Sequence, residues 1–268
     1  MSAIAAMPPR RLMPKPVVLS IAGYDPSSGA GITADIKTIA AHRCYGISCI
    51  TALTVQSTRG VMRVDPVEGR IITEMLEELA ADIDIAAVKI GMLGSAESAR
   101  AVAGFLKRHQ LRNVVVDPII KSSSGADLAS KEALAILRDK LLAQVDVITP
   151  NIFEAAVLTG IEISSPEHMR TAALRLQQMG ARSVVVTGGH LPAPLDLVAP
   201  RGGAPMILEG KQISSQSTHG TGCAFSTSLA CGLAKGKSLM EAARAAKRYV
   251  EAALRKAPLI GTGVGPLV

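Results

Sequence analysis

Short runs of β-branched and aliphatic residues alternate along the chain with longer segments in which apolar residues recur every three to four positions. The first pattern is typical of strands buried on both faces, and the second of amphipathic helices. We expect strands over residues 17–22, 45–55, 85–90, 114–116, 145–149 and 183–187. We expect helices over residues 32–42, 97–109, 131–142, 151–159, 167–179, 223–234 and 239–256, and a further helix starting at Pro66.

This alternation predicts an α/β fold with one doubly wound, mostly parallel sheet and helices on both faces. Two more short strands, residues 195–198 and 206–208, flank a Gly/Pro-rich turn and predict a small two-stranded flap. No linker, low-complexity segment or internal repeat divides the 268 residues. We therefore expect a disordered tail over residues 1–15 and a single domain over residues 16–268.

Charge and aromatic content bear on the kind of ligand. The formal net charge is +7, but the basic residues are scattered, and three Phe, three Tyr and no Trp offer little for bases to stack on. We therefore expect an anionic small-molecule substrate and no nucleic acid. We also expect no membrane span, because no run of about 18 apolar residues occurs. Four Cys without a CxxC pair favour a reduced, cytoplasmic protein.

Ligands of open parallel sheets bind beyond the carboxyl ends of the strands, and two such ends here are glycine-rich. Residues 23–31 (GYDPSSGAG) allow the backbone to approach a ligand closely. Gly220, Thr221 and Gly222 precede an apolar helix, where free N–H groups and the helix dipole predict an anion hole. Cys223 falls in the first turn of that helix, where a lowered thiol pKa is expected. A Cys hydrolase pairing His219 with Cys223 is an alternative.

Three other strand ends carry polar groups. Asn151 and Glu154 start a predicted helix and share one face, so they either hold Mg²⁺ through water or simply cap the helix. Asp117, before a proline, either forms a turn or helps to hold the metal. Thr187 begins the stretch TGGH at the end of another strand. Neither a Walker A sequence nor GxGxxG is present, which weakens an NAD-binding reading.

Seven stretches match one family in order and spacing: SIAGYDPSSGAGITADIKT, ITALTVQSTRGV, KIGML, VVDPII, ITPNIFEA, VVTGGH and STHGTGCAFS. Together they resemble the hydroxymethylpyrimidine/phosphomethylpyrimidine kinases of thiamine biosynthesis, which belong to the ribokinase-like superfamily. The resemblance covers nearly the whole chain from residue 17 onward. It implies a ribokinase-like fold, a homodimer, ATP and Mg²⁺ as cofactors, and two successive phosphorylations of the pyrimidine alcohol.

The resemblance also implies roles for individual residues. Gly23, Asp35, Gln56 and Met92 would bind the pyrimidine. Cys223 would accept the proton of the substrate hydroxyl, beside an anion hole formed by the Gly220, Thr221 and Gly222 amides. Asn151, Glu154, Thr187 and Gly189 would bind the nucleotide, with Asp117 and Glu154 at the metal. The flap would cover the site.

This chain departs from the family pattern at two positions, so alternative functions remain. Thr187 stands where the family often has Lys, and Thr also occurs there in related enzymes that phosphorylate pyridoxal. Tyr24 replaces a small residue. A pyridoxal or pyridoxine kinase is therefore the alternative within the fold, and a non-catalytic pyrimidine-binding sensor is the alternative outside catalysis. Gln56 favours the pyrimidine, because its amide can pair with a ring nitrogen and an amine.

Overall fold

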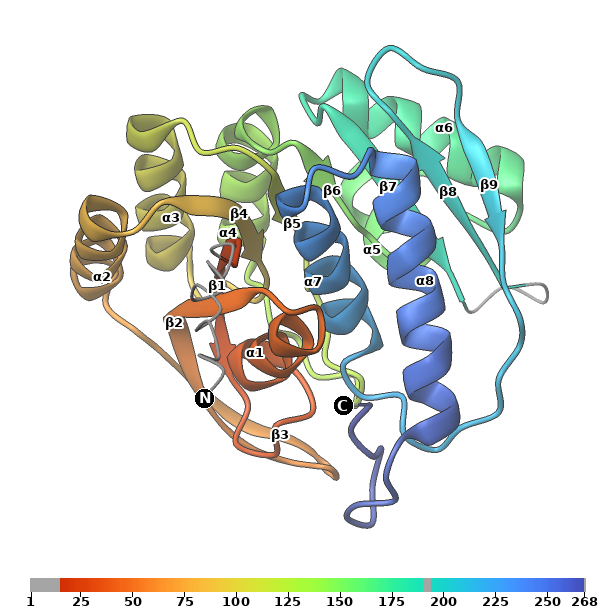
Figure 1. The fold of residues 1–268 in the computed structure, drawn as a ribbon, viewed down its shortest axis with the longest axis horizontal. Helices are drawn as coiled ribbons and strands as arrows, with labels where there is room; N and C mark the ends of the chain where they lie inside the picture. The colour runs from red at the N-terminus through yellow and green to blue at the C-terminus, as the bar shows by residue number, and fades with distance from the viewer. Residues whose placement is uncertain (1–14, 190–193, 268) are drawn as a thin grey trace, which may run out of the picture.

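The computed structural model describes residues 15–189 and 194–267, so the predicted tail lies outside it except for Lys15. Within these ranges nine strands form one sheet in the order β3-β2-β1-β4-β5-β6-β7-β8-β9 (Figure 1). The strands are β1 (Val17–Tyr24), β2 (Tyr45–Ser57), β3 (Gly60–Pro66), β4 (Ile85–Ile90), β5 (Val114–Val116), β6 (Val147–Ile148), β7 (Ser183–Gly188), β8 (Leu195–Ala199) and β9 (Met206–Glu209).

The strands from β2 to β7 are all parallel in this order, whereas β3, β8 and β9 run antiparallel to their neighbours at the two edges. From β1 the chain adds strands first on one side of the sheet (β2 and β3) and then on the other side (β4 onward). This change of direction is expected of a doubly wound sheet. The predicted α/β, mostly parallel fold is confirmed. Parallel strands are buried on both faces, which explains their continuous runs of Val and Ile.

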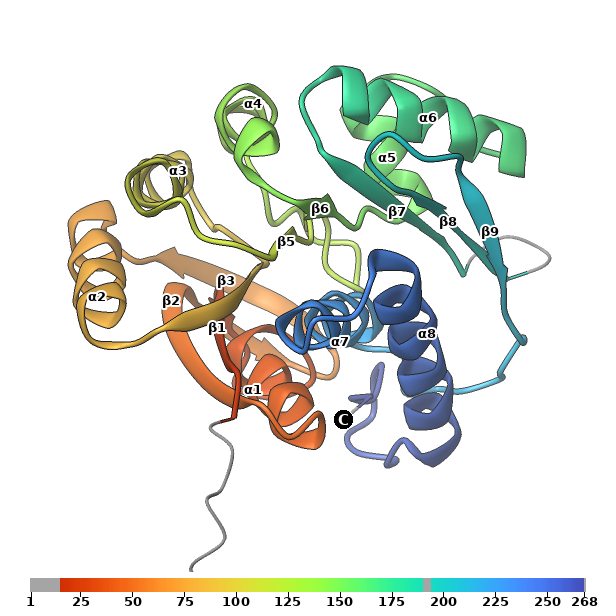
Figure 2. The same cartoon turned by 45° about the horizontal axis from the view of Figure 1, so that its top comes forward.

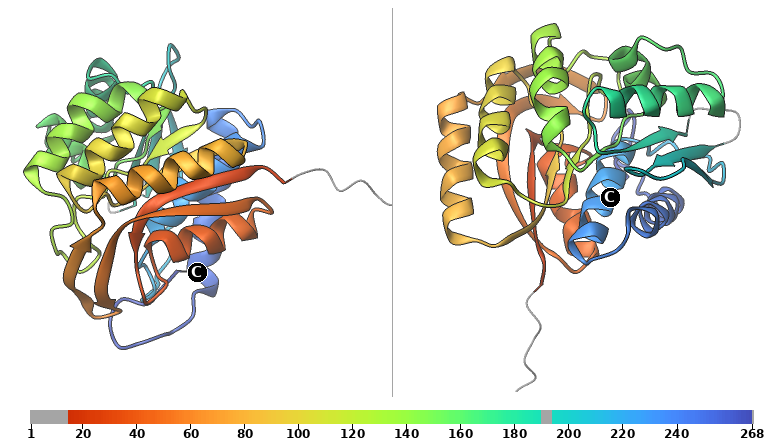
Figure 3. Two further views of the ribbon diagram at one scale, coloured as in Figure 1. Left: turned by 90° about the vertical axis from the view of Figure 1, so that its left-hand side faces the viewer. Right: turned by 90° about the horizontal axis from the view of Figure 1, so that it is seen from above.

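Helices cover both faces of the sheet (Figures 2 and 3). The described helices are α1 (Gly31–Ala41), α2 (Gly69–Asp82), α3 (Ala96–His109), α4 (Lys131–Ile136), α5 (Ile152–Thr159), α6 (Pro166–Gln178), α7 (Thr221–Ala234) and α8 (Leu239–Lys256). Helices α2 to α6 share one apolar core with the sheet, and α1, α7 and α8 share a second core on the other face. None of the helices in these ranges is long and apolar enough to cross a membrane.

Helix α7 is the most deeply buried helix next to the site. Ten consecutive residues, Cys223 to Gly232, are buried between the sheet, α1 and α8. A Cβ at Gly232 would lie 2.8 Å from the Cβ of Ala242, so the absence of a side chain there lets α8 pack closely on α7. This packing fixes the amino end of α7 beside the strand ends.

Two predictions about local structure were wrong. The strands predicted over residues 195–198 and 206–208 are present as β8 and β9. They do not stand as a flap but pair with β7 and extend the main sheet, because the edge of β7 offers unpaired backbone groups. Strand β3 was missed: it forms a hairpin with β2, and Pro66 ends this strand instead of starting a helix. The predicted helix over residues 131–142 continues beyond Ile136 as a π-helical turn and a 3₁₀ turn.

Candidate active site

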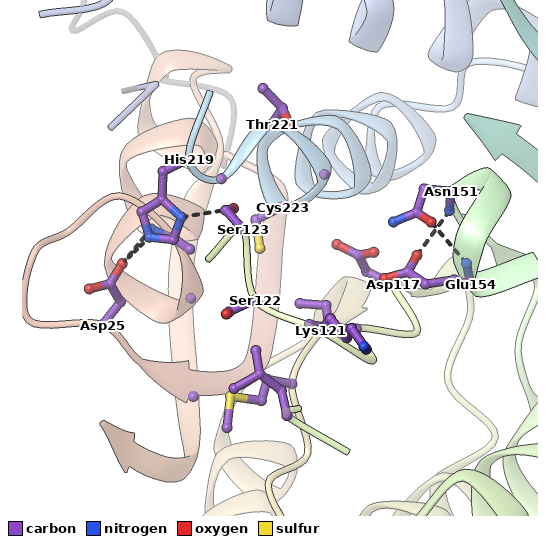
Figure 4. A pocket seen from close by; sticks show the side chains of 18 of the residues that line it. Asp25, Asp117, Lys121, Ser122, Ser123, Asn151, Glu154, His219, Thr221 and Cys223 are labelled. Carbon is purple, nitrogen blue, oxygen red and sulfur yellow. Dashed lines mark hydrogen bonds and ion pairs between the residues drawn. The ribbon is translucent and has the colours of Figure 1, made fainter. Parts of the chain in front are cut away.

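A cavity of about 460 Å³ lies where the parallel strands end (Figure 4). Its wall combines segments from the whole chain, as expected at the carboxyl ends of strands. Most of the predicted site residues line it: Gly23, Gln56, Met92, Asp117, Asn151, Glu154, Thr187, Gly220, Thr221, Gly222 and Cys223. Asp35 and Gly189 do not.

Two glycine-rich loops meet at one side of the cavity. Gly220 has φ +85°, and a Cβ there would lie 1.9 Å from the carbonyl oxygen of Gly29. Gly31 has φ +59°, and its Cβ would lie 2.2 Å from the carbonyl oxygen of Gly23. Both positions therefore require glycine for conformation and for space. The loop after β1 and the loop before α7 fit against each other only because these side chains are absent.

The amino end of α7 opens into the cavity. The Thr221 N–H donates to the carbonyl of Thr218 at 3.3 Å. In the described part of the chain, the N–H groups of Gly222 and Cys223 have no such acceptor. A Cβ at Gly222 would lie 3.7 Å from Oδ2 of Asp117, so a side chain here would be in van der Waals contact with the buried carboxylate. The N–H of Gly220 also has no backbone acceptor among the described residues, so of the three predicted amides Gly220 and Gly222 are free and Thr221 is not. The N–H of Cys223 adds a further free donor, with the helix dipole behind it.

His219 is held by partners from three other segments (Figure 4). Its Nε2 lies 2.8 Å from Oδ2 of Asp25, and its Nδ1 lies 3.2 Å from Oγ of Ser123. Burial alone would raise the pKa of Asp25, but hydrogen bonds from His219 and Ser27 outweigh it and lower that pKa. An ionised carboxylate only accepts hydrogen bonds, so Nε2 carries the proton. The amide nitrogen of Gln56 packs 3.0 Å from the same Nε2, but both atoms are donors in this tautomer, so no hydrogen bond joins them.

Sequence reasoning missed Asp25 and Ser123 as site residues. Asp25 lies in the glycine-rich stretch 23–31, but nothing in the spacing of either residue links it to His219. They are 194 and 96 residues from it along the chain. Their placement also bears on the hydrolase alternative: the ring of His219 is engaged by Asp25 and Ser123, and no contact with Cys223 occurs among the described residues.

Asp117, Asn151 and Glu154 form the opposite wall of the cavity. Asn151 and Glu154 make a reciprocal capping box at the start of α5, with both hydrogen bonds at 2.9 Å. Burial raises the pKa of Asp117 to about 6, against the charge of Lys89 and a hydrogen bond from Ser226. Burial and the nearby charge of Asp117 raise the pKa of Glu154 to about 8. Burial and mutual repulsion make it costly for both carboxyl groups to be ionised at once. A cation bound beside them would stabilise their charged forms.

Thr187 extends this wall. It makes a parallel bridge with Asn151, and its N–H donates to the carbonyl of Pro150 at 2.9 Å. Gly189 is exposed just past β7 and does not line the cavity, and His190 lies outside the described residues.

The sequence matches the family described as phosphomethylpyrimidine kinase over residues 25–268. A hydroxymethylpyrimidine/phosphomethylpyrimidine kinase of Haemophilus influenzae is 42% identical over 93% of this chain and 94% of its own length. A thiamine biosynthesis bifunctional protein of Geobacter sulfurreducens is 43% identical, and this chain spans 53% of its length. The chain belongs to the phosphomethylpyrimidine kinase family.

Solved structures agree with this assignment. A phosphomethylpyrimidine kinase of Clostridium difficile matches with a TM-score of 0.80 and 36% identity, covering 89% of this chain and 99% of its own. A Bacillus subtilis pyridoxal kinase in complex with ADP matches with a TM-score of 0.86 and 34% identity, covering 94% of this chain and 96% of its own. The expected ribokinase-like fold is confirmed, and the protein is an ATP-dependent phosphotransferase.

In this kinase the expected lowering of the Cys223 pKa is wrong. Burial raises the pKa of the thiol to about 12, although the charge of Lys89 and the N–H of Gly31 act in the opposite direction. The helix terminus favours a thiolate, but only 6% of the residue is exposed, and the loss of hydration dominates. In the free kinase Cys223 is therefore a neutral thiol at neutral pH.

Asp35 does not lie where the family resemblance implied. Its side chain is fully buried behind the cavity wall, where it forms an ion pair with Lys89. Direct contact with a pyrimidine in this cavity does not fit that position. Asp35 lies in the first turns of α1, but its side chain points into the protein, where its partners are Lys89, Ser20 and Thr227.

Proposed function

We propose that this kinase transfers phosphate from ATP to the hydroxyl of 4-amino-5-hydroxymethyl-2-methylpyrimidine, and then to the resulting monophosphate, in cytoplasmic thiamine biosynthesis. The observation that carries the proposal is the position of Gln56 in the cavity wall together with Gly23 and Met92. The Thr54 hydroxyl lies 3.2 Å from its Oε1 and closer, at 2.9 Å, to the carbonyl of Tyr24, so the amide oxygen keeps capacity to accept from a ligand.

The Gln56 amide suits an aminopyrimidine. Because Nε2 of His219 is committed to Asp25, the amide nitrogen of Gln56 keeps a donor for a ring nitrogen. Its oxygen can accept from an exocyclic amine beside that nitrogen. A buried donor and acceptor that pair with the correct ring reject rings that lack these groups, since the amide would otherwise remain unpaired.

The amino end of α7 supplies the chemistry of transfer. The N–H groups of Gly222 and Cys223, with the helix dipole, stabilise negative charge on the transferring phosphoryl group. Cys223 lines the same cavity and is the residue to accept the proton of the attacking hydroxyl. Burial keeps it a thiol in the free protein, so it positions the hydroxyl by hydrogen bonding. It accepts the hydroxyl proton only after its own proton has been lost to solvent when the ligands bind.

The donor set facing Gly222 fits Mg²⁺ brought by the nucleotide. Asp117 and Glu154 are hard oxygen donors, and among the described residues no group of three or more His, Cys, Asp or Glu side chains is placed to hold a metal. Mg²⁺ commonly takes one or two carboxylates and completes its shell with water and phosphate oxygens. Asp117 and Glu154 would hold it, Asn151 and Thr187 would border the phosphates, and Gly189 would approach the nucleotide. Bound Mg²⁺ would neutralise charge on the phosphates.

A pyridoxal kinase is the second candidate. Thr187 at the nucleotide side departs from the lysine common in the family, and a Staphylococcus aureus pyridoxal kinase bound to AMP-PCP and pyridoxal matches with a TM-score of 0.86 and 31% identity. Gln56 weighs against this candidate.

We also propose a homodimer formed through the outer face of the β2–β3 hairpin. Side chains alternate along a strand, so Thr54 and Gln56 face the cavity while Leu53 and Val55 face away. Leu53 and Val55 are 49% and 42% exposed, which is costly for two adjacent apolar side chains on a free surface.

The test is a coupled ADP-release assay with Mg-ATP and four conditions: the hydroxymethylpyrimidine, its monophosphate, pyridoxal, and no acceptor. We expect ADP release with the pyrimidine and its monophosphate. We expect Gln56→Leu to raise KM for the pyrimidine by roughly tenfold or more, because it removes both hydrogen bonds. Preference for pyridoxal would transfer the assignment to the second candidate, and no ADP above the blank would favour the non-catalytic sensor.

A further inference from the structure

The most deeply buried charges next to the site belong to Lys89 and Asp35. Both side chains are fully buried, and Nζ of Lys89 lies 2.8 Å and 3.1 Å from the two carboxylate oxygens of Asp35. Neither residue lines the cavity. Burying two ions costs much of what their attraction returns, so a buried pair is weak evidence for a purely stabilising role.

The carboxylate of Asp35 joins four elements at one point. Asp35 belongs to α1 and Lys89 to β4. The hydroxyl of Ser20 in β1 donates to Asp35 at 2.6 Å, and the hydroxyl of Thr227 in α7 donates to it at 2.7 Å. Both carboxylate oxygens of Asp35 accept hydrogen bonds from these side chains. A buried polar network whose members are all hydrogen-bonded is rigid.

Helices α1 and α7 pack against each other, and both begin at the cavity. Gly31, at the start of α1, and Cys223, near the start of α7, both line it. Asp35 is four residues after Gly31, and Thr227 is four residues after Cys223. Residues four apart lie on one face of a helix. The Asp35–Thr227 bond therefore fixes the two helices relative to each other one turn behind Gly31 and Cys223.

The same region of α7 brings a further hydroxyl to the site. Oγ of Ser226 lies 3.1 Å from Oδ2 of Asp117, and 3.0 and 3.1 Å from the carbonyls of Gly222 and Cys223, so the carboxylate is one of three acceptors in its reach. Cys223, Ser226 and Thr227 thus form a polar stripe at helical spacing on a helix that is otherwise buried among apolar residues. The stripe faces the cavity at one end and the ion pair at the other.

We propose that Lys89 and Asp35 are positioning residues for phosphoryl transfer: their ion pair, through Thr227, sets the rotation and depth of α7 and thereby the place of Cys223 and the Gly222 amide. This inference rests on the proposed role of the α7 terminus. Lys89 lies in the stretch KIGML, next to the strand end that carries Met92, so the pair also ties α7 to the substrate side of the cavity.

The first test uses Thr227, because its variants keep the charges paired and are expected to fold. Thr227→Val keeps the shape of the side chain and removes only the hydroxyl, whereas Thr227→Ser keeps the hydroxyl. We expect Thr227→Val to lower kcat by roughly tenfold with KM values within about threefold of wild type, since small misplacements of reacting groups are costly and the lining residues are intact. We expect Thr227→Ser to retain most of the wild-type kcat.

The second test neutralises the pair. In Lys89→Met/Asp35→Asn, no uncompensated charge remains, so we expect the protein to fold while kcat falls by roughly tenfold or more. The control is Leu76→Ala, a cavity-forming variant in α2, which contributes no residue to the site. It should lower the melting temperature without lowering kcat at 25 °C.

The outcomes separate the two proposals. A wild-type enzyme without kinase activity would reject the proposed function itself. An active wild type with unchanged kcat in both Thr227→Val and Lys89→Met/Asp35→Asn would overturn the positioning role. Equal losses of kcat in Leu76→Ala would do the same, because they would trace the effect to stability alone.

Discussion

At the scale of single residues, two opposing effects act on the pKa of Cys223. The amino terminus of α7 and the charge of Lys89 favour a thiolate, but burial is stronger and raises the pKa to about 12. A thiol that carries its own proton cannot accept another, so Cys223 acts as a base only after that proton has been lost on ligand binding. Phosphoryl transfer depends mainly on alignment and charge stabilisation, so a weak proton acceptor is sufficient.

Replacing this thiol tests its role directly. We expect Cys223→Ala to lower kcat by more than about tenfold, because a positioned proton acceptor contributes at least that much. Binding of the pyrimidine and of Mg-ATP, measured by calorimetry, should stay close to wild type. The matched control is Cys49→Ala: Cys49 is equally buried, and burial raises its pKa to about 12 as well, but it does not line the cavity. Full activity in Cys223→Ala would remove the assigned role.

At the scale of elements, the turn into α7 separates two kinds of glycine. Gly220 has a positive φ and almost touches Gly29, so it is needed for the loops to fit. Gly222 has ordinary helical surroundings, and its nearest neighbours are the oxygens of Asp117 across the cavity. The first glycine serves the fold, and the second leaves room for a ligand beside the free N–H groups.

Alanine should therefore have opposite effects at these two positions. Gly222→Ala should keep or slightly raise the melting temperature, because alanine favours helix by up to about 1 kcal/mol, while kcat falls as the methyl group narrows the anion hole. Gly220→Ala should lower the melting temperature instead. Thermal denaturation and steady-state kinetics on both variants check this contrast. Normal kinetics in Gly222→Ala would argue against an anion hole at this terminus.

At the scale of the whole molecule, the sheet has two different edges. One ends in β8 and β9 and the other in the β2–β3 hairpin, which contributes Thr54 and Gln56 to the cavity and presents Leu53 and Val55 outward. A contact on the outer face would therefore support the wall that carries Gln56. This gives the proposed homodimer a consequence for substrate binding as well as for assembly.

The oligomeric state is measured by light scattering after size exclusion. We expect a dimer for the wild type and a monomer for Leu53→Glu/Val55→Glu, because buried unpaired charges at an apolar contact are strongly unfavourable. As a control, Ile260→Glu changes another exposed apolar residue outside the hairpin and should remain dimeric. A monomeric wild type would refute the dimer, and a dimeric double variant would place the contact elsewhere.

Periodicity and strand-end composition were enough to predict the order of strands and helices, the parallel sheet and most of the cavity wall. Periodicity identifies elements because burial selects apolar residues at fixed intervals, and glycine-rich strand ends mark the ligand edge. Pairing of edge strands is not encoded in this way: β8 and β9 look like a flap until the unpaired edge of β7 is in place. Only the tertiary structure could turn Asp35 toward Lys89, bring Asp25 and Ser123 to His219, and bury Cys223 deeply enough to reverse its expected pKa shift. These outcomes depend on contacts between residues far apart in the chain, and on the loss of water that those contacts impose.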